Sequence, residues 1–147
     1  GGWLHDDLAT LLDGEGYIRF EPRGQYIGTE PYNKWTKPSC VLIGEDNYSD
    51  ACGFPYVYKT LGIGKLIGAP VPGTMTAVWW ENQIDPSIVF GIPQVGALGV
   101  KEGRYLENMQ IEPDILVYND PASVLRGEDR QLEAAVKEML KTIDSNK

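Results

Sequence analysis

The sequence predicts an α/β fold, and three observations support that prediction. Residues 40–44 form a short, wholly apolar run, which is typical of a strand buried on both faces of a parallel sheet. A helical stretch follows that run, and a second strand is expected from Lys65. The chain ends on an apolar stripe at helical spacing, from Leu132 to Ile143. Strands that alternate with helices in this way are the pattern of α/β domains.

The N-terminal third is expected to hold a helix, a strand and a loop. Residues 4–12 have leucines on one helical face and two aspartates in the first turn. Residues 17–21 alternate as a strand does. Residues 22–38 are polar and contain Gly and Pro, so we expect a long loop there, and long loops in compact domains are often functional.

The rest of the chain alternates between strands and helices. After the strand at residues 40–44, a helix is expected to run to residue 61. Further strands are expected over residues 65–68, 76–80, 88–92 and 115–118. Asp120 before Pro121 predicts a helix start, because Asp caps helices well and Pro is favoured at the first helical position. We expect the final helix to pack onto the domain through its apolar stripe: Leu132, Ala135, Val136, Met139, Leu140 and Ile143.

Composition excludes several classes of protein. The chain has 147 residues, 42% of them hydrophobic, which is enough for a folded core. Its net charge of −8 argues against nucleic acid or an anionic membrane as partner. No apolar run approaches the ~20 residues that span a bilayer. A single histidine argues against a structural zinc site, and we expect no cofactor.

The start of the chain and its two cysteines leave questions open. The sequence begins Gly-Gly-Trp-Leu without an initiator methionine, so we expect a fragment of a larger multidomain protein. Its compartment stays open, cytoplasm or periplasm of a prokaryote being the two alternatives. Cys40 is expected to be a buried thiol, Cys52 a packing residue, and a disulfide between them remains an alternative.

The most informative stretch is the junction between the strand at residues 40–44 and the helix that follows. A serine at such a turn can expose its hydroxyl at the end of the sheet. The unpaired backbone N–H groups at the helix start can stabilise an oxyanion, as they do in the nucleophile elbow of esterases. On spacing alone, a serine in the position of Ser49 is more often a plain helix cap than a nucleophile, because Asn, Ser and Asp are ordinary capping residues.

Four segments combine in this chain: Gly1-Gly2 at its start, Asn-Tyr-Ser-Asp-Ala at residues 47–51, Gly-Lys-Leu-Ile-Gly at residues 64–68, and Glu-Asn with Pro-Asp within residues 107–114. Together they resemble the tricorn-like serine peptidases, which share a clan with the carboxy-terminal-processing peptidases. Residues 47–51 are similar to the nucleophile motif, and residues 64–68 to the strand after the nucleophile helix. Gly1 and Gly2 resemble the end of the Asn-Gly-Gly-Gly oxyanion turn. Residues 107–114 resemble the Glu-Asn…Pro-Asp motif. The resemblance implies that residues 1–147 are the C-terminal catalytic portion of a serine peptidase domain.

The resemblance also implies a fold and a set of site residues. The fold is the crotonase-like spiral of strand-strand-helix units. Peptide bonds are hydrolysed through an acyl-enzyme on Ser49, and the oxyanion is held by the N–H of Asp50 and of Gly1 or Gly2. Glu107 matches the glutamate that orients a second serine and a histidine. That pair lies upstream in the family, so we expect the isolated 147-residue chain to be inactive.

The base and the partners follow from the same resemblance. Carboxy-terminal-processing relatives use a catalytic lysine in the turn that matches residues 68–74. This turn contains no lysine here, and Thr74 stands about where the lysine would be expected. This favours the histidine-based subtype. Lys59 and Lys65 are the candidate lysine bases, but Lys59 is ~15 Å along the helix from Ser49, out of reach, and Lys65 is expected to be a solvated strand end. His5 is expected to be a surface residue near the helix start, and a base that reaches Ser49 is its alternative role. The implied partners are peptide or unfolded protein substrates and other copies of the parent protein.

Other functions remain open. A non-catalytic ligand- or peptide-binding domain of the same fold, like the retinoid-binding repeats, is the first alternative. An acyl-CoA enzyme of the crotonase type ranks last, because no basic, Gly-rich nucleotide cradle is evident. The aromatic residues, Trp79 and Trp80 among them, either line a peptide cleft or pack in the core. In the peptidase interpretation, Ser49 and Glu107 converge on one cleft, because functional groups gather outside the carboxyl ends of the strands.

Overall fold

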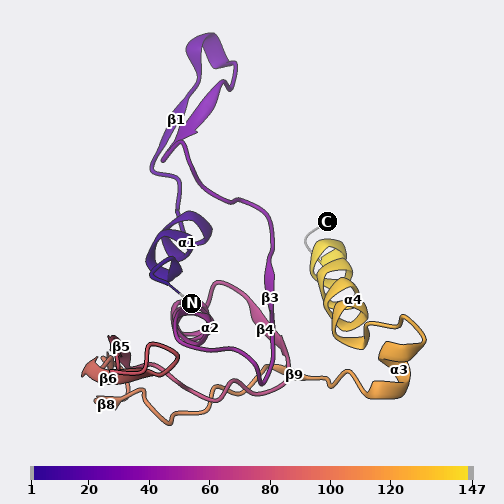
Figure 1. Cartoon of the computed structure of the whole chain (residues 1–147). Helices are drawn as coiled ribbons and strands as arrows, with labels where there is room; N and C mark the ends of the chain where they lie inside the picture. Colours follow the sequence, from indigo (N-terminus) through magenta and orange to yellow (C-terminus); the bar gives the residue numbers. More distant parts are fainter. Residues whose placement is uncertain (1, 146–147) are drawn as a thin grey trace.

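A three-stranded parallel sheet lies at the centre of the fold. The computed structural model describes residues 2–145. The sheet has the order β3 (Cys40–Ile43), β4 (Lys65–Gly68) and β9 (Ile115–Leu116). Helix α2 (Asp50–Leu61) lies on one side of these strands and α4 (Arg130–Ser145) on the other (Figure 1). The α/β prediction is confirmed at this level, with mixed helix and strand content.

The core is packed between α2 and the sheet. Cys52, Tyr58 and Leu66 are fully buried there. The Tyr58 hydroxyl is satisfied by a 2.7 Å hydrogen bond with Oγ of Ser39. At Gly64 an added Cβ would lie 2.3 Å from that hydroxyl, so the turn into β4 requires glycine. These contacts fix the helix that begins just after Ser49.

The N-terminal region forms a helix and a hairpin. Helix α1 (His5–Leu12) packs against α2. Strand β1 (Ile18–Phe20) pairs antiparallel with β2 (Gly28–Glu30), with the short 3₁₀ turn η1 (Pro22–Gly24) between them. The hairpin stands away from the central sheet (Figure 1). The prediction of an unbroken loop over residues 22–38 was therefore wrong at β2, whose Gly-Thr-Glu sequence is too short to show alternation.

A second hairpin follows the central strand. Strand β5 (Ala77–Asn82) pairs antiparallel with β6 (Val89–Val95), as the two predicted strands suggested. The ladder shifts register between Ala77 and Val78. The two-residue strands β7 (Leu98–Gly99) and β8 (Arg104–Tyr105) were not anticipated, because two residues carry no periodicity.

Strand β3 is an edge strand among the described residues, not the interior strand that its apolar run predicts. Only β4 pairs with it, and Leu42 is 42% exposed. An all-apolar run indicates that a strand is apolar on both faces. It does not indicate whether other chain segments cover those faces.

Helix α4 packs through only part of its stripe. Ala135 is buried and Met139 half-buried, on the helix that contacts β3 and β4. The remaining members are exposed, so the expectation that the whole stripe packs onto the body was wrong for them: Leu132, Val136, Leu140 and Ile143. The stripe is wider than the one surface that the sheet offers.

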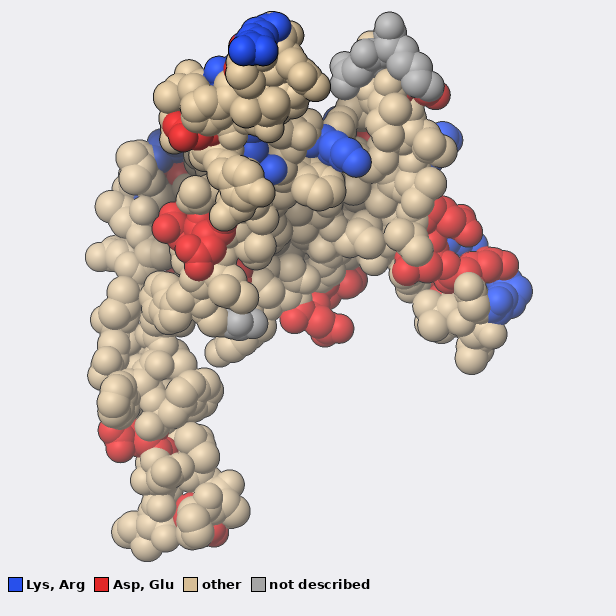
Figure 2. Space-filling model, turned by 90° about the horizontal axis from the view of Figure 1, so that it is seen from above, with Lys and Arg blue, Asp and Glu red and all other residues tan. Residues whose placement is uncertain are grey.

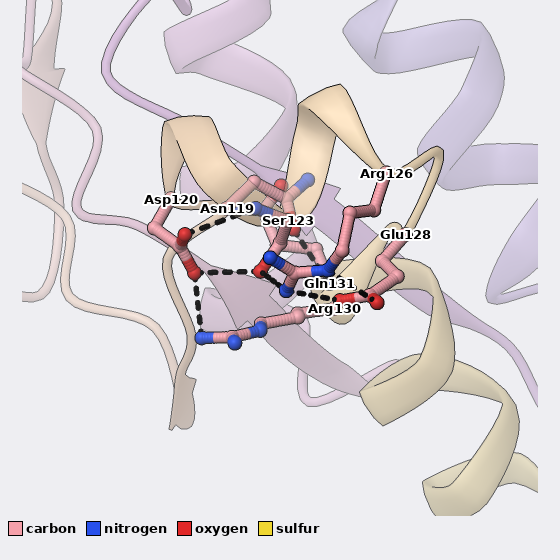
Figure 3. A network of polar contacts seen from close by, with 7 residues as sticks. All are labelled: Asn119, Asp120, Ser123, Arg126, Glu128, Arg130 and Gln131. Atoms are coloured by element: carbon pink, nitrogen blue, oxygen red, sulfur yellow. Dashed lines mark hydrogen bonds and ion pairs between the residues drawn. The ribbon is translucent and has the colours of Figure 1, made fainter.

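The corner before α4 is held by a polar network (Figure 3). Helix α3 (Pro121–Leu125) starts as predicted, with the Asp120 side chain accepting the N–H of Ser123 at 3.0 Å. Asp120 also pairs with Arg130 at 2.7 Å, and the amide oxygen of Asn119 accepts the N–H of Gln131. This network joins α3 to the start of α4. Within residues 2–145 no helix is both long and apolar enough to cross a bilayer.

Candidate active site

Ser49 is the last residue before α2, and its backbone is strained. Its φ and ψ are 57° and −122°, in a region that residues with a side chain rarely adopt. The sequence predicts this position at the start of the helix, and the structure confirms it. The Ser49 side chain makes no capping hydrogen bond. A plain helix cap gains stability from that bond, so the capping interpretation is wrong for this serine.

Thr74 and Cys52 form hydrogen bonds at the strained turn that contains Ser49. Oγ1 of Thr74 accepts the backbone N–H of Ser49 at 3.3 Å. The same oxygen lies 3.2 Å from Sγ of Cys52, and that thiol also donates to the carbonyl of Asn47 at 3.2 Å. Cys52 is fully buried, as a packing residue should be, whereas Cys40 is only half-buried, so the expectation of a buried thiol was wrong for Cys40. Both are free thiols. Burial, reinforced by the nearby charge of Glu138, raises the pKa of Cys40.

Asp50 joins the start of α2 to the start of α1. Its backbone N–H stands at the first helical position, where no acceptor exists within the helix. Its carboxylate accepts the N–H of Leu4 at 3.0 Å and contacts Nδ1 of His5. Gly2, with a φ of 123°, lies near the same place, because it lines the same cleft as Asp50. Gly1, the other predicted oxyanion donor, lies outside the described residues.

His5 differs from its expected position on the surface. It is the first residue of α1, its side chain is 29% exposed, and it faces Asp50 inside the cleft. Sequence reasoning missed this pairing because 45 residues separate the two side chains. No motif signals it.

The two lysines weighed as bases have partners elsewhere. Nζ of Lys59 donates to the carbonyl of Glu112 at 2.7 Å and lies 3.5 Å from Asp114. Nζ of Lys65 contacts Glu138 on α4. Neither lysine lines the cleft that contains Ser49. The structure thus agrees with the expectation that Lys65 is a strand-end residue.

Glu107 binds the backbone that leads into β5. One carboxylate oxygen accepts the N–H groups of Met75 and Thr76, both at 2.7 Å. Burial alone would raise the pKa of Glu107, but the hydrogen bonds from Thr76 and Met75 outweigh it, so the pKa lies below its ordinary value. Met75 and Thr76 line the cleft with Ser49, whereas Glu107 lies behind them. Glu107 is not among the described residues that line this cleft, so the expectation that it and Ser49 converge on one cleft is not met. The two are linked through residues 74–76.

The cleft has a volume of about 290 Å³ and brings four segments together. They are the residues before and within α1, the start of α2, the segment entering β5, and the β5–β6 hairpin. Figure 2, which views the molecule from above, shows at the lower left an arm with few charged side chains on the face that is seen. The lining residues are Gly2, Trp3, His5, Tyr48, Ser49, Asp50, Gly53, Met75, Thr76, Ala77, Val78, Trp80, Val95 and Ala97.

Comparisons with known proteins agree on one family. The model of peptidase family S41 matches residues 8–117. A protein of Chlamydia pneumoniae is 34% identical over 116 residues, which is 77% of this chain and 18% of that protein. The tricorn protease of Thermoplasma acidophilum is 25% identical over 143 residues, covering 97% of this chain and 13% of its own length.

The solved structures support the same relationship at the level of the fold. A crystal structure of the tricorn protease superposes with a TM-score of 0.83 and 23% identity, over 98% of this chain and 14% of that one. The chain therefore spans less than a fifth of the length of these relatives.

Proposed function

Because this chain belongs to peptidase family S41, we propose that it carries the nucleophile of a tricorn-like serine peptidase. Ser49 is that nucleophile. The observation that carries the proposal is the strained backbone of Ser49 at the N-terminus of α2, combined with a hydroxyl that caps nothing. Strain of this kind persists where function requires a side chain to be held in one position.

The reaction proceeds through an acyl-enzyme. Oγ of Ser49 attacks the carbonyl carbon of the scissile peptide bond, its proton passes to a base, and a tetrahedral oxyanion forms. The N–H of Asp50 and an N–H of the Gly1–Gly2 turn stabilise that oxyanion. The base returns the proton to the leaving amine as the C–N bond breaks. Water then hydrolyses the ester on Ser49 in the same manner, releasing the second product.

The base is a histidine from outside these 147 residues, oriented by a second serine and by Glu107. Two observations support this assignment. Lys59 and Lys65 have partners outside the cleft, and the polar side-chain contact of His5 among the described residues is with Asp50, not with Ser49. Against the effect of burial, hydrogen bonds from Thr76 and Met75 hold the pKa of Glu107 below its ordinary value, which favours the ionised form that the third group of a relay requires. The isolated chain is then inactive.

The parent fold is the crotonase-like spiral of strand-strand-helix units. The superposition on the tricorn protease supports a shared fold over nearly all of this chain. Peptides or unfolded proteins are the substrates, and the parent protein is a homo-oligomer. Hydrodynamic measurement of the parent's mass tests the last point, and a monomer would contradict it.

Peptide hydrolysis by the full-length parent tests the proposed function. Ser49→Ala should lower kcat by at least about 10³-fold, because it removes the nucleophile. Ser87→Ala is the matched control and should leave kcat unchanged, since Ser87 hydrogen-bonds to Asp85 in an exposed turn and does not line the cleft. Equal activity of the Ser49→Ala variant would assign the nucleophile to another residue, and absence of hydrolysis by the wild-type parent would support a binding domain of the same fold instead. His5→Ala tests the competing base: a loss as large as that of Ser49→Ala would reassign the base to His5.

A further inference from the structure

One wall of the cleft is apolar and comes from the β5–β6 hairpin. Val78 and Trp80 lie on the same face of β5, because strand residues alternate between faces, and both line the cleft together with Val95 of β6. Trp79 is not among the lining residues, and its indole N–H donates to Glu81. The two adjacent tryptophans are about equally exposed, 57% and 60%, but only Trp80 lines the cleft.

The indole of Trp80 lies against its cross-strand partner. Trp80 pairs with Gly91 in the ladder. A Cβ added at Gly91 would lie 3.0 Å from the Trp80 ring, so the ring lies directly over the glycine. An aromatic ring supported by backbone in this way is a flat apolar surface that is already in place before a ligand binds.

The cleft offers no uncompensated charge to a ligand. Among the described residues that line it, Asp50 and His5 are the only acidic or basic ones. The two contact each other, and Asp50 also accepts the N–H of Leu4. A charged substrate side chain would lose water there without gaining a partner, which is unfavourable. An apolar side chain would replace water on an apolar wall, which is favourable.

We infer that this wall is the subsite for an apolar or aromatic substrate side chain, on the residue whose carbonyl Ser49 attacks. The inference rests on the proposed function and adds the class of substrate to it. A cleft of about 290 Å³ is at the small end of ligand pockets, which suits one or two side chains. Trp80 is the residue that determines specificity, and Val78 and Val95 complete the wall.

The test uses the full-length parent protein and four acetylated peptidyl-aminomethylcoumarin substrates. They differ only in the residue before the coumarin: Phe, Leu, Lys or Asp. We expect kcat/KM for Phe and Leu to exceed that for Lys and Asp by at least about 10-fold. Trp80→Ala should reduce the ratio of Phe to Lys toward one, whereas Trp80→Phe should keep it. Trp79→Ala, the matched control, should leave the ratio as in the wild type.

A preference of the wild-type protein for Lys or Asp would overturn the inference, whatever the variants do. Equal effects of Trp79→Ala and Trp80→Ala on the ratio would also overturn it. These failures are distinct from failure of the proposed function. If no substrate is cleaved and a fluorophosphonate leaves Ser49 unmodified, the peptidase assignment itself is wrong and the subsite falls with it. If Ser49 is modified and Lys is preferred, only the subsite is wrong.

Discussion

The carboxylate of Asp50 contacts Nδ1 of His5 and accepts the N–H of Leu4, so one side chain ties the start of α2 to the start of α1. The two tied segments are those that carry the proposed oxyanion donors. One proposed donor is the N–H of Asp50 itself, and the other is the N–H of Gly1 or Gly2, just before Trp3 in the sequence. The Asp50 side chain thus ties the backbone of one proposed donor to the segment that follows the other.

Removing the Asp50 carboxylate should separate the two donors. In the parent protein we expect Asp50→Ala to lower kcat by about 10- to 100-fold, less than full loss of an oxyanion donor costs. KM should change little, because the apolar wall is untouched. Asp50→Asn should retain more of the activity, since its amide oxygen still accepts the Leu4 N–H. Steady-state kinetics with one peptide substrate measure both constants, and wild-type kcat in Asp50→Ala would refute the positioning role.

Thr74 should hold the strained turn through its hydroxyl. Thr74→Val keeps the shape of the side chain but removes the acceptor of the Ser49 N–H and the polar partner of Cys52. Leaving such groups unpaired costs about 1–3 kcal/mol in the free energy of unfolding. We also expect a fall in kcat of about 10-fold, because each 1.4 kcal/mol lost from the transition state is one factor of ten.

Thr74→Ser serves as the control for that experiment, because it restores the hydroxyl. Urea unfolding and peptide hydrolysis should both return toward wild-type values in it. If Thr74→Val and Thr74→Ser behave alike in both assays, the hydroxyl has no part in holding Ser49.

Glu107 should make stability fall in acid. Its folded pKa lies below the ordinary value of 4.5, so the ionised carboxylate stabilises the folded chain at neutral pH. That contribution is lost as the pH falls through the folded pKa, when the carboxylate bound to Met75 and Thr76 becomes protonated. Between about pH 7 and pH 3, the free energy of unfolding should fall more steeply in the wild type than in Glu107→Gln.

Chemical unfolding at a series of pH values measures this difference. Glu15→Gln is the control, since Glu15 is exposed, and its pH dependence should match that of the wild type. Parallel curves for the wild type and Glu107→Gln would show that the two backbone hydrogen bonds do not favour the ionised form.

Local chemistry explains which elements the sequence predicts well. The Asp120–Pro121 start of α3 and the strand-to-helix junction at Ser49 depend on neighbouring residues, and both were predicted correctly. Strand β3 was misjudged as interior, because its neighbours are set by tertiary packing. Tertiary packing also decides how much of the α4 stripe is covered, which is why part of that stripe is exposed contrary to the prediction.

In the candidate site, too, local motifs could be recognised from the sequence, whereas contacts between distant segments could not. Its motif residues, Ser49, Asp50 and Glu107, were found through a resemblance carried by short segments. The contacts that link them to Thr74, His5 and Met75 join parts of the chain far apart in sequence. No single sequence shows such contacts. The role of Trp80 was left open between cleft and core because exposure decides it, and the structure shows an exposed ring on the cleft.

Covalent labelling of Ser49 is the measurement that tests the central claim most directly. The full-length parent would be treated with a fluorophosphonate, digested, and mapped by mass spectrometry. An activated serine nucleophile forms a stable phosphonyl ester, whereas an ordinary hydroxyl does not react. We predict one modified serine, Ser49, with no modification in Ser49→Ala and negligible modification of the isolated 147-residue chain. A labelled parent in which Ser49 is unmodified and another serine carries the probe would contradict the account.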